Sequence, residues 1–388
     1  MNNIECAICG TNSVIFQETL QGYPVGNIYL TNFDEGRDYL KDFTLTQCFC
    51  GHLMGQSKIP SEIFYKENYP YLGTSKIVKE RHKFGVSFVS RLSDQGEINN
   101  IIDIGCSSMN LLRNFKQRTK IQGSFVGIDP VPLNEIAEDI QFINDFFENS
   151  SFTLTNIYNT PNLILLDNVL EHIVDLREFL SKLIEWINVG DLVYICVPSL
   201  ETMISKFRFE EISHEHVHYF SLTALHSLFS NFGFHLLLQS NEEVFSRGYN
   251  FLLFRFDGLL RASAVNTRED RTMHIDQMFE QFKRELRRVE LPAKSQYWGV
   301  CASELTPAIA YFMGNSLDFL NAIFDTTDSK AEKYMPGVTA KILPWSRLVD
   351  VARSDSFYVT VPSLFNSVIP NLRSLGFRNF HSFAFNFN

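Results

Sequence analysis

A short segment in the middle of the chain, Ile212-Ser-His-Glu-His-Val-His-Tyr-Phe-Ser221, holds the densest group of residues capable of chemistry. If the segment is extended, His214, His216 and His218 share one face and Glu215 points the other way, because side chains alternate along a strand. Three imidazoles on one face could bind a metal ion, which would suit a zinc-dependent hydrolase. A single imidazole could instead act as a general base near neutral pH, with Glu215 orienting and polarising it. A purely structural histidine cluster is the third interpretation.

A second group of such residues lies near the N-terminus, where four of the seven cysteines form two knuckles. Cys6 and Cys9 are separated by two residues and followed by glycine, a spacing at which two thiolates can point at one tetrahedral metal ion. Cys48 and Cys50 are one residue closer together, so the nearby His52 could replace one of them as a ligand. We expect a structural zinc ion rather than disulfides, because the N-terminus shows no secretory signal. Four reduced cysteines without a metal ion are the alternative.

The hydrophobic pattern indicates which elements position these residues. Strands alternate with amphipathic stretches in the middle of the chain, with strands expected at 101–104, 124–128, 163–166 and 192–197. This order predicts an α/β fold with a doubly wound parallel sheet. A second alternation of this kind follows near the C-terminus, with strands expected at 298–302, 319–324, 356–361 and 380–385. It predicts a second, smaller Rossmann-like domain.

These patterns divide the chain into five parts. We expect a small zinc-binding β module at 1–58, a Tyr-rich segment and helix that cap the site at 59–95, a core domain at 96–258, a linker helix at 259–292 and the C-terminal Rossmann-like domain at 293–388.

Acidic and small residues stand where the strands of the core domain would end, the edge at which α/β sheets bind ligands. The candidates for binding a nucleoside cofactor are Asp103, Gly105, Asp129, Asp145, Asp167 and Asn168. Asp129 would accept from ribose hydroxyls and Asp145 from an adenine amino group. A lone acid after a strand is more often a helix cap, but four strand ends in order are more specific.

This constellation resembles the class I S-adenosylmethionine-dependent methyltransferases, whose "VLEH" segment corresponds here to Val169-Leu-Glu-His172. The resemblance implies that S-adenosylmethionine is the cofactor. The family usually carries a second glycine in the first loop, and that position corresponds here to Met109. Its side chain could crowd the cofactor or merely reshape the loop.

The whole chain, taken in order, looks like the sugar C-methyltransferases, which methylate nucleotide-linked keto-deoxysugars. The N-terminal cysteines, the His-Glu-His-x-x-Tyr-Phe-Ser segment, Asn68-Tyr-Pro-Tyr71 and the C-terminal stretch from Asp325 through Lys330 to Met335-Pro-Gly337 carry this resemblance. It implies that His216 is a base that forms an enolate, supported by Glu215.

The same resemblance implies a sugar site lined by His172 and by Tyr69 or Tyr71, with His214 as a further catalytic candidate. Where the family has a tyrosine before His-Glu-His, this chain has Ser213. Its Gly-Gly-Ser segment corresponds to Ser246-Arg-Gly-Tyr249. Independently of the resemblance, Lys76, Lys79, Arg81 and Lys83 could bind a diphosphate or form a solvated helix face, and Arg247 is a further candidate for binding phosphate. The departures leave open a different acceptor, transfer to oxygen or nitrogen, or a catalytically silent binding protein.

The overall charge narrows the range of partners. The chain has 34 Lys and Arg against 44 Asp and Glu, which gives a net charge of −10 and no long basic run. Binding to nucleic acid or to an anionic membrane is therefore not expected. No apolar run is long enough to cross a bilayer. We expect a soluble, cytoplasmic protein that acts on a small molecule, while its oligomeric state is left open.

Overall fold

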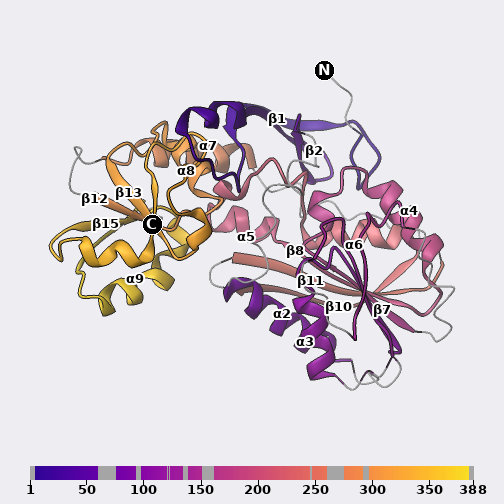
Figure 1. Cartoon of the computed structure of the whole chain (residues 1–388). Helices are drawn as coiled ribbons and strands as arrows, with labels where there is room; N and C mark the ends of the chain where they lie inside the picture. Colours follow the sequence, from indigo (N-terminus) through magenta and orange to yellow (C-terminus); the bar gives the residue numbers. More distant parts are fainter. Residues whose placement is uncertain are drawn as a thin grey trace.

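The computed structural model describes residues 5–59, 76–92, 98–119, 121, 123–133, 139–150, 161–244, 247–259, 275–291 and 297–383. Tyr69 and Tyr71 lie outside these residues. Three sheets organise the described chain, and Figure 1 shows the C-terminal part on one side, the large central sheet on the other, and the N-terminal strands above them. Within these ranges no helix has the length and apolar character that crossing a membrane requires.

The N-terminal sheet has four antiparallel strands in the order β1-β2-β3-β9. These strands are β1 (Val14–Pro24), β2 (Leu40–Cys48), β3 (Leu53–Ser57) and β9 (His218–Tyr219), with the 3-10 helix η1 (Phe33–Tyr39) between the first two. The last strand belongs to the histidine-rich segment, whose His218 pairs with Met54. The N-terminal module therefore holds that segment in place.

The central sheet has seven strands in the order β10-β11-β8-β7-β4-β5-β6. They are β4 (Asn100–Ile104), β5 (Phe125–Ile128), β6 (Gln141–Ile143), β7 (Asn162–Asp167), β8 (Leu192–Pro198), β10 (Phe234–Val244) and β11 (Arg247–Phe256). The strands from β6 to β8 are parallel, and β11 runs antiparallel to both of its neighbours. The expected doubly wound α/β fold is confirmed.

Helices cover both faces of the central sheet, which explains why its middle strands are continuously buried. On one face lie α2 (Lys76–Val89) and α3 (Asn110–Arg118), and on the other lie α4 (Leu176–Trp186) and α6 (Leu222–Asn231) (Figure 1). Helix α4 starts at Asp175, which accepts from the Glu178 N–H, and buries Leu176, Phe179 and Leu183 on one stripe. The 3-10 helices η5 (Leu170–His172) and η6 (Phe209–Glu211) and the short helix α5 (Leu200–Ser205) lie in the connections.

The C-terminal domain contains a five-stranded parallel sheet in the order β14-β13-β12-β15-β16. Its elements are β12 (Tyr297–Val300), α8 (Thr306–Met313), β13 (Leu320–Asp325), η8 (Asp328–Lys330), β14 (Ile342–Pro344), η9 (Trp345–Asp350), β15 (Ser356–Val359), η10 (Pro362–Leu364), α9 (Phe365–Ser374) and β16 (Asn379–Ser382). The sheet matches the expected smaller Rossmann-like unit, although β14 was not anticipated.

One hydrophobic core joins the N-terminal and C-terminal sheets. The linker helix α7 (Ile275–Arg287) contributes buried Phe279 and Phe282 to it, as its apolar stripe predicts. Tyr23 of β1 lies edge-on to Tyr311 of α8, and its hydroxyl donates to the Ile212 carbonyl oxygen at 2.6 Å. The histidine-rich segment thus begins at a point fixed by three parts of the chain.

Candidate functional site

The three parts of the molecule surround one cavity of about 1230 Å³. The carboxyl ends of β4, β5 and β7 contribute to its wall, which is where parallel α/β sheets bind ligands. The rest of the wall comes from the N-terminal module, the histidine-rich segment and the loops after β12 and β13. A cavity of this size can hold two ligands side by side.

The loop after β4 requires a glycine at its first position. Gly105 has φ +74°, and a Cβ atom there would lie 2.7 Å from Cγ2 of Val169. Its N–H donates to the Ile128 carbonyl oxygen at 2.8 Å. The loop therefore passes close to β5 and leaves its backbone facing the cavity.

Asp129, directly after β5, is buried and held from two sides. Its Oδ2 accepts from the Ser107 N–H at 2.8 Å and its Oδ1 from the Val131 N–H at 2.9 Å. Burial raises the pKa of Asp129, and the two backbone N–H groups lower it. Each carboxylate oxygen keeps a further lone pair for a hydroxyl donor.

Asp103 of β4 is 2% exposed and lines the cavity. Its Oδ1 has no hydrogen-bond partner within the described part of the chain. Burial, and then repulsion from Asp167 and Asp129, raise the pKa of Asp103 well above its usual value. A buried acceptor without a partner is costly unless a ligand supplies a donor or a positive charge. The sulfonium and ammonium groups of S-adenosylmethionine meet that need, so these residues fit the cofactor.

Met109 does not close this site. The residue has φ +56°, and its side chain is fully buried in the core cluster that contains Leu112 and Phe115. It is not among the residues that line the cavity. Ser107, in the same loop, also has a positive φ of 46°. Of the two possibilities that the sequence leaves for Met109, the structure shows that it reshapes the loop.

Asp167, at the end of β7, is paired with a residue that the sequence analysis assigned to phosphate or to solvent. Arg81 of α2 places Nη2 2.5 Å from Oδ1 of Asp167, and Nε2 of His82 lies 3.7 Å from the same oxygen. Burial would raise the pKa of Asp167, but Arg81 and His82 bring it down to about 2. Arg81 could have been found, because it lies on the apolar stripe that runs from Ile77 to Phe88.

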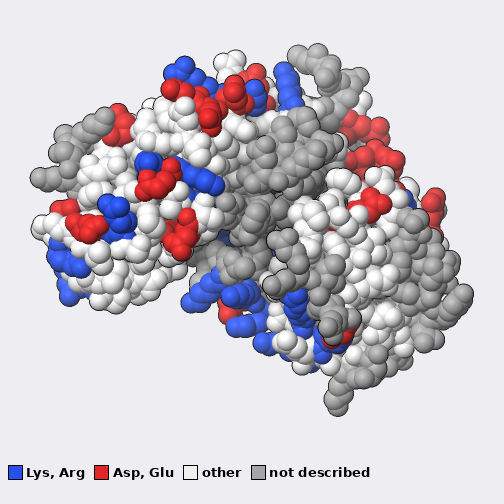
Figure 2. Space-filling model, viewed as in Figure 1, with Lys and Arg blue, Asp and Glu red and all other residues white. Residues whose placement is uncertain are grey.

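The other cofactor candidates lie at the same edge. Asn168 has φ +56° and lines the cavity. Asp145 also lines the cavity, and its Oδ1 accepts from the Phe146 N–H at 2.8 Å. The remaining candidates for phosphate, Lys79 and Lys83, line a separate hollow with Asn110 and Asn114 of α3. Figure 2 shows basic side chains gathered on this part of an otherwise mixed surface.

Two imidazoles meet inside the cavity. The rings of His172 and His216 lie 4.9 Å apart in a T-shaped arrangement. The Nδ1 atom of His172 lies 3.0 Å from the Glu215 carbonyl oxygen, which can only accept, so Nδ1 carries the proton and Nε2 is free to accept. Burial lowers the pKa of His172 to about 4, and burial with His172 and Arg247 nearby lowers that of His216 well below its usual value. Both rings are neutral bases at pH 7.

The three histidines of the segment do not gather around one point, so the three-imidazole metal site that the sequence left open as an alternative does not form. His214 is held by Ser57 at 2.9 Å and by the Tyr23 carbonyl oxygen at 3.0 Å. His218 lies 3.1 Å from the imidazole of His52. Only the last two residues of the segment before Phe220 are extended, so the alternation that the prediction assumed is absent.

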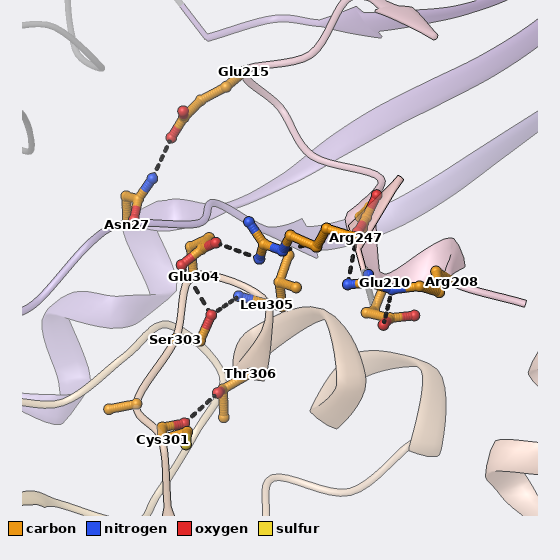
Figure 3. Close-up of polar contacts among 12 residues, drawn as sticks. Asn27, Arg208, Glu210, Glu215, Arg247, Cys301, Ser303, Glu304, Leu305 and Thr306 are labelled. Atoms are coloured by element: carbon orange, nitrogen blue, oxygen red, sulfur yellow. Dashed lines mark hydrogen bonds and ion pairs between the residues drawn. The ribbon is translucent and has the colours of Figure 1, made fainter. Parts of the chain in front are cut away.

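The Glu215 carboxylate does not orient an imidazole. Its Oε1 accepts from the Asn27 side chain at 3.1 Å (Figure 3). Its backbone carbonyl, by contrast, contacts His172. Burial raises the pKa of Glu215 to about 7, against the lowering effect of Asn27, and Glu304 raises it further. Glu215 thus contacts His172 rather than the expected base His216, and it does so through its backbone carbonyl.

Arg247 joins the core domain to the C-terminal domain. Its Nη2 lies 2.8 Å from Oε1 of Glu304, and its Nε lies 3.9 Å from Oε1 of Glu211 (Figure 3). Burial alone would raise the pKa of Glu304, but Arg247 lowers it to about 2. Two carboxylates already neutralise the guanidinium, which argues against the expected phosphate contact.

On the C-terminal side of the cavity, Asp325 is held much as Asp129 is. Its Oδ2 accepts from the Ala302 N–H and its Oδ1 from the Thr327 N–H, both at 2.9 Å. Lys330 places Nζ 3.8 Å from Oδ1 of Asp325 and donates to the Ala302 carbonyl oxygen. This loop therefore offers a ligand two kinds of group: the carboxylate oxygens of Asp325 as acceptors, and the ammonium group of Lys330 as a cation.

The four N-terminal cysteines converge. The Sγ atoms of Cys6 and Cys50 lie 3.6 Å apart, those of Cys9 and Cys48 lie 3.5 Å apart, and all four lie within 4.8 Å of one another. Tetrahedral zinc with bonds of about 2.3 Å needs sulfur atoms roughly 3.8 Å apart, so the donor set fits this ion. His52 is outside the cluster and contacts His218, so it does not replace a cysteine.

The carboxyl ends of the parallel strands thus line the cavity, as in α/β folds that bind a ligand at this edge of the sheet. Residues 77–239 match the family model described as a methyltransferase domain. Over this region the chain is similar to a methyltransferase domain.

Among curated proteins, the chain is 24% identical over 237 residues to "C-methyltransferase NovU" of Streptomyces niveus, a match that covers 59% of this chain and 55% of NovU. The chain thus spans about half the length of this relative. The N-methyltransferase NodS of Bradyrhizobium japonicum, solved with S-adenosylhomocysteine, is 14% identical, with a TM-score of 0.35 over 50% of this chain and 96% of that one. The 1,6-didemethyltoxoflavin-N1-methyltransferase of Burkholderia thailandensis is 10% identical, with a TM-score of 0.39 over 53% of this chain and 95% of that one.

Proposed function

We propose that the protein C-methylates a nucleotide-linked keto-deoxysugar, with S-adenosylmethionine as the methyl donor and His216 as the general base. One observation carries the proposal. Two neutral imidazoles, those of His172 and His216, line the same cavity as the acids of the cofactor end and the loop that carries Asp325. The similarity to NovU, a C-methyltransferase, supports transfer to carbon.

The C-terminal side of the cavity suits a nucleoside diphosphate. Asp325 has the two backbone contacts that Asp129 has, and so presents lone pairs to ribose hydroxyls in the same way. Lys330 adds a positive charge beside it, which favours a phosphate group. We place the nucleotide of the acceptor here, with its sugar reaching toward His216.

S-adenosylmethionine, when bound, supplies an electrophilic methyl group. The residues that would hold it are Asp103, Gly105 and Asp129. His216 accepts the proton from the carbon beside the ketone, which makes that carbon nucleophilic. His172, fixed by the Glu215 carbonyl, accepts a hydrogen bond through Nε2 and keeps the acceptor in line.

We further propose that the four cysteines hold a structural zinc ion. Cys48 ends β2, and Cys50 lies in the turn before β3, the strand that pairs with β9. A closed tetrahedral site stabilises the fold and leaves no position for a catalytic water. The metal would thus support the histidine-rich segment from outside the cavity.

Exchange of the acceptor's proton with solvent tests this proposal. In deuterated buffer with S-adenosylhomocysteine, the protein should exchange the proton beside the ketone of a keto-sugar nucleotide, and His216→Asn should slow exchange by roughly 100-fold. His226 is exposed on α6, so His226→Asn is the matched control and should exchange at the rate of the unaltered protein.

Two other outcomes would redirect the proposal. Methyl transfer to a hydroxyl or an amine without any exchange would identify an O- or N-methyltransferase of the same pathways, because a neutral imidazole can also deprotonate those groups. Failure to bind S-adenosylhomocysteine at all would identify a binding protein that keeps the fold without catalysis.

A further inference from the structure

A buried carboxylate stands beside the two imidazoles of the cavity without taking part in the proposed reaction. Glu171 belongs to η5 and is 1% exposed, and neither of its carboxylate oxygens has a hydrogen-bond partner within the described part of the chain. Arg81, the cation held at the end of β7, is already paired with Asp167. A buried carboxylate is costly unless it is paired or coordinates a metal ion. Glu171 therefore lacks the positive charge that its burial calls for.

Glu171 lies within reach of both imidazoles. One of its carboxylate oxygens, one ring nitrogen of His172 and one ring nitrogen of His216 all lie within 4.8 Å of one another. Zinc bonds of about 2.0–2.2 Å to nitrogen and oxygen place tetrahedral ligand atoms roughly 3.3 Å apart. The three atoms thus have to approach one another by at most about 1.5 Å to share one ion.

Hydrogen bonds to the histidine-rich segment hold this group together. The Glu171 carbonyl oxygen accepts from the Val217 N–H at 2.8 Å, which ties η5 to the segment. Nδ1 of His172 donates to the Glu215 carbonyl oxygen at 3.0 Å, so the lone pair of its ring is on Nε2. A histidine that binds a metal ion usually donates its other ring nitrogen to a carbonyl or carboxylate in this way. The arrangement is therefore set before any ion arrives.

The donor atoms indicate which ion fits. Two imidazole nitrogens and one carboxylate form the ligand set of many catalytic zinc sites, whereas Mg²⁺ and Ca²⁺ prefer oxygen ligands. His172 and His216 line the cavity, so an ion held by them would be open on that side. The four N-terminal cysteines do not line the cavity and form a separate, all-sulfur donor set.

We propose that Glu171, His172 and His216 form a second metal site, which binds a divalent transition-metal ion of the zinc class and blocks proton transfer when it is filled. The site itself is independent of the proposed function, and only the block rests on it. The ring lone pairs with which His216 would take the proton and His172 would position the acceptor are the ones that an ion needs. The ion and the acceptor therefore exclude each other.

The absorption of cobalt(II) separates the two metal sites. Cobalt bound by thiolates has strong charge-transfer absorption in the near ultraviolet, whereas cobalt bound by imidazoles and a carboxylate has only weak visible bands. Zinc-loaded protein titrated with cobalt(II) chloride should gain the weak bands. Glu171→Gln should weaken that binding by at least about 100-fold, because even the loss of a contact that supports a ligand costs about 10- to 100-fold.

Two exposed residues supply matched controls. Glu185→Gln on α4 and His226→Asn on α6 should bind cobalt as the unaltered protein does. The proton-exchange assay then tests the block. Added zinc chloride should slow exchange of the acceptor's proton in proportion to the fraction of sites filled. Glu171→Gln should need at least about 100-fold more zinc for the same fractional slowing, whatever its rate without zinc.

Three results would overturn the inference: weak bands that survive unchanged in Glu171→Gln, thiolate absorption from every cobalt ion that binds, or zinc that displaces this cobalt without slowing exchange. If Glu171→Gln does not fold, His172→Asn decides by the same titration, and bands that persist there also overturn it. If the unaltered protein exchanges no proton even without added metal, the proposed function fails, and the cobalt titration alone decides whether the site exists.

Discussion

The two α/β sheets of this chain end in loops that have nearly the same backbone geometry. In the central sheet the Gly105 N–H donates to the Ile128 carbonyl oxygen at 2.8 Å, one residue before Asp129. In the C-terminal sheet the Cys301 N–H donates to the Phe324 carbonyl oxygen at 2.9 Å, one residue before Asp325. In both, the loop then donates a backbone N–H to the carboxylate.

The side chains around the two loops differ in charge. Two residues before Gly105 stands Asp103, whereas two residues before Cys301 stands Gly299, whose Cβ position lies 2.7 Å from Cγ1 of Ile323. Lys330 lies beside the second loop. The loop backbone is thus similar in the two sheets, but the charges beside it differ: a carboxylate stands beside the first loop and a lysine beside the second. Under the proposed function, this difference would favour a cationic cofactor at the first loop and a phosphate group at the second.

The largest expected effect comes from removing each carboxylate in turn. Asp129→Asn should weaken S-adenosylhomocysteine by roughly 10- to 100-fold and leave a nucleoside diphosphate unaffected, and Asp325→Asn should do the reverse. Titration calorimetry of both variants with both ligands measures this. If both variants lose affinity for the same ligand, the two loops do not hold separate ligands, which would contradict the proposed division of roles between the two sheets.

Gly105 should matter more for stability than Cys301, the residue at the matching position in the loop of the C-terminal sheet. Gly105→Ala forces a side chain at φ +74° against Val169 and should destabilise the protein by about 1–3 kcal/mol. Cys301 already has φ +76°, so Cys301→Gly should leave the free energy of unfolding unchanged or raise it by up to about 1 kcal/mol. Denaturant unfolding compares the two, and a larger loss for Cys301→Gly would contradict the assignment.

The ion pair between Arg247 of the core domain and Glu304 of the C-terminal domain should contribute little to stability. Glu304 is about a third exposed, so Arg247→Met should lower the free energy of unfolding by about 1 kcal/mol or less. Glu304→Gln in the same chain should recover part of that loss. A double-mutant cycle by urea unfolding gives the coupling, and a coupling near zero would show that Arg247 does not join the regions energetically.

A further comparison concerns the dependence of stability on pH. The pKa of His172 is depressed to about 4, so its neutral form persists far below the ordinary histidine range. Its contribution to stability is present above pH 6.5 and is lost as the pH falls through about 4. The unfolding free energy of His172→Asn should therefore fall less between pH 6.5 and 4 than that of the unaltered protein. Equal slopes would show that His172 is not buried as a neutral ring.

The sequence predicted the parallel strands β4, β5, β7 and β8 of the central sheet well, because they are apolar and bounded by acids or turns, but it did not predict the antiparallel strands β10 and β11. Strand β14 was missed because it has three residues and ends in Pro344, which leaves no pattern to detect. The four cysteines were found as a group, since knuckle spacing is local. The histidine-rich segment was misjudged because partners far away in the chain, such as Tyr23 and His52, fix the orientation of its rings.

Arg81 shows a different kind of limit. The place of Arg81 on the apolar stripe of α2 indicates that it is buried, but nothing within α2 indicates that Asp167 is its partner. Only the layering of α2 over the carboxyl ends of the strands brings the two together. The roles of Tyr69 and Tyr71 stay predictions, because they fall outside the described residues.

The edge strand β9 has a consequence for synthesis on the ribosome. His52 and His218, which stack across the boundary between β3 and β9, are 166 positions apart. The first sheet to be translated is therefore completed only after the parallel strands of the central sheet, β4 to β8, because its fourth strand, β9, follows them in the chain. Until then the edge of β3 is open to other chains, and a nascent fragment ending before residue 218 should be prone to aggregation.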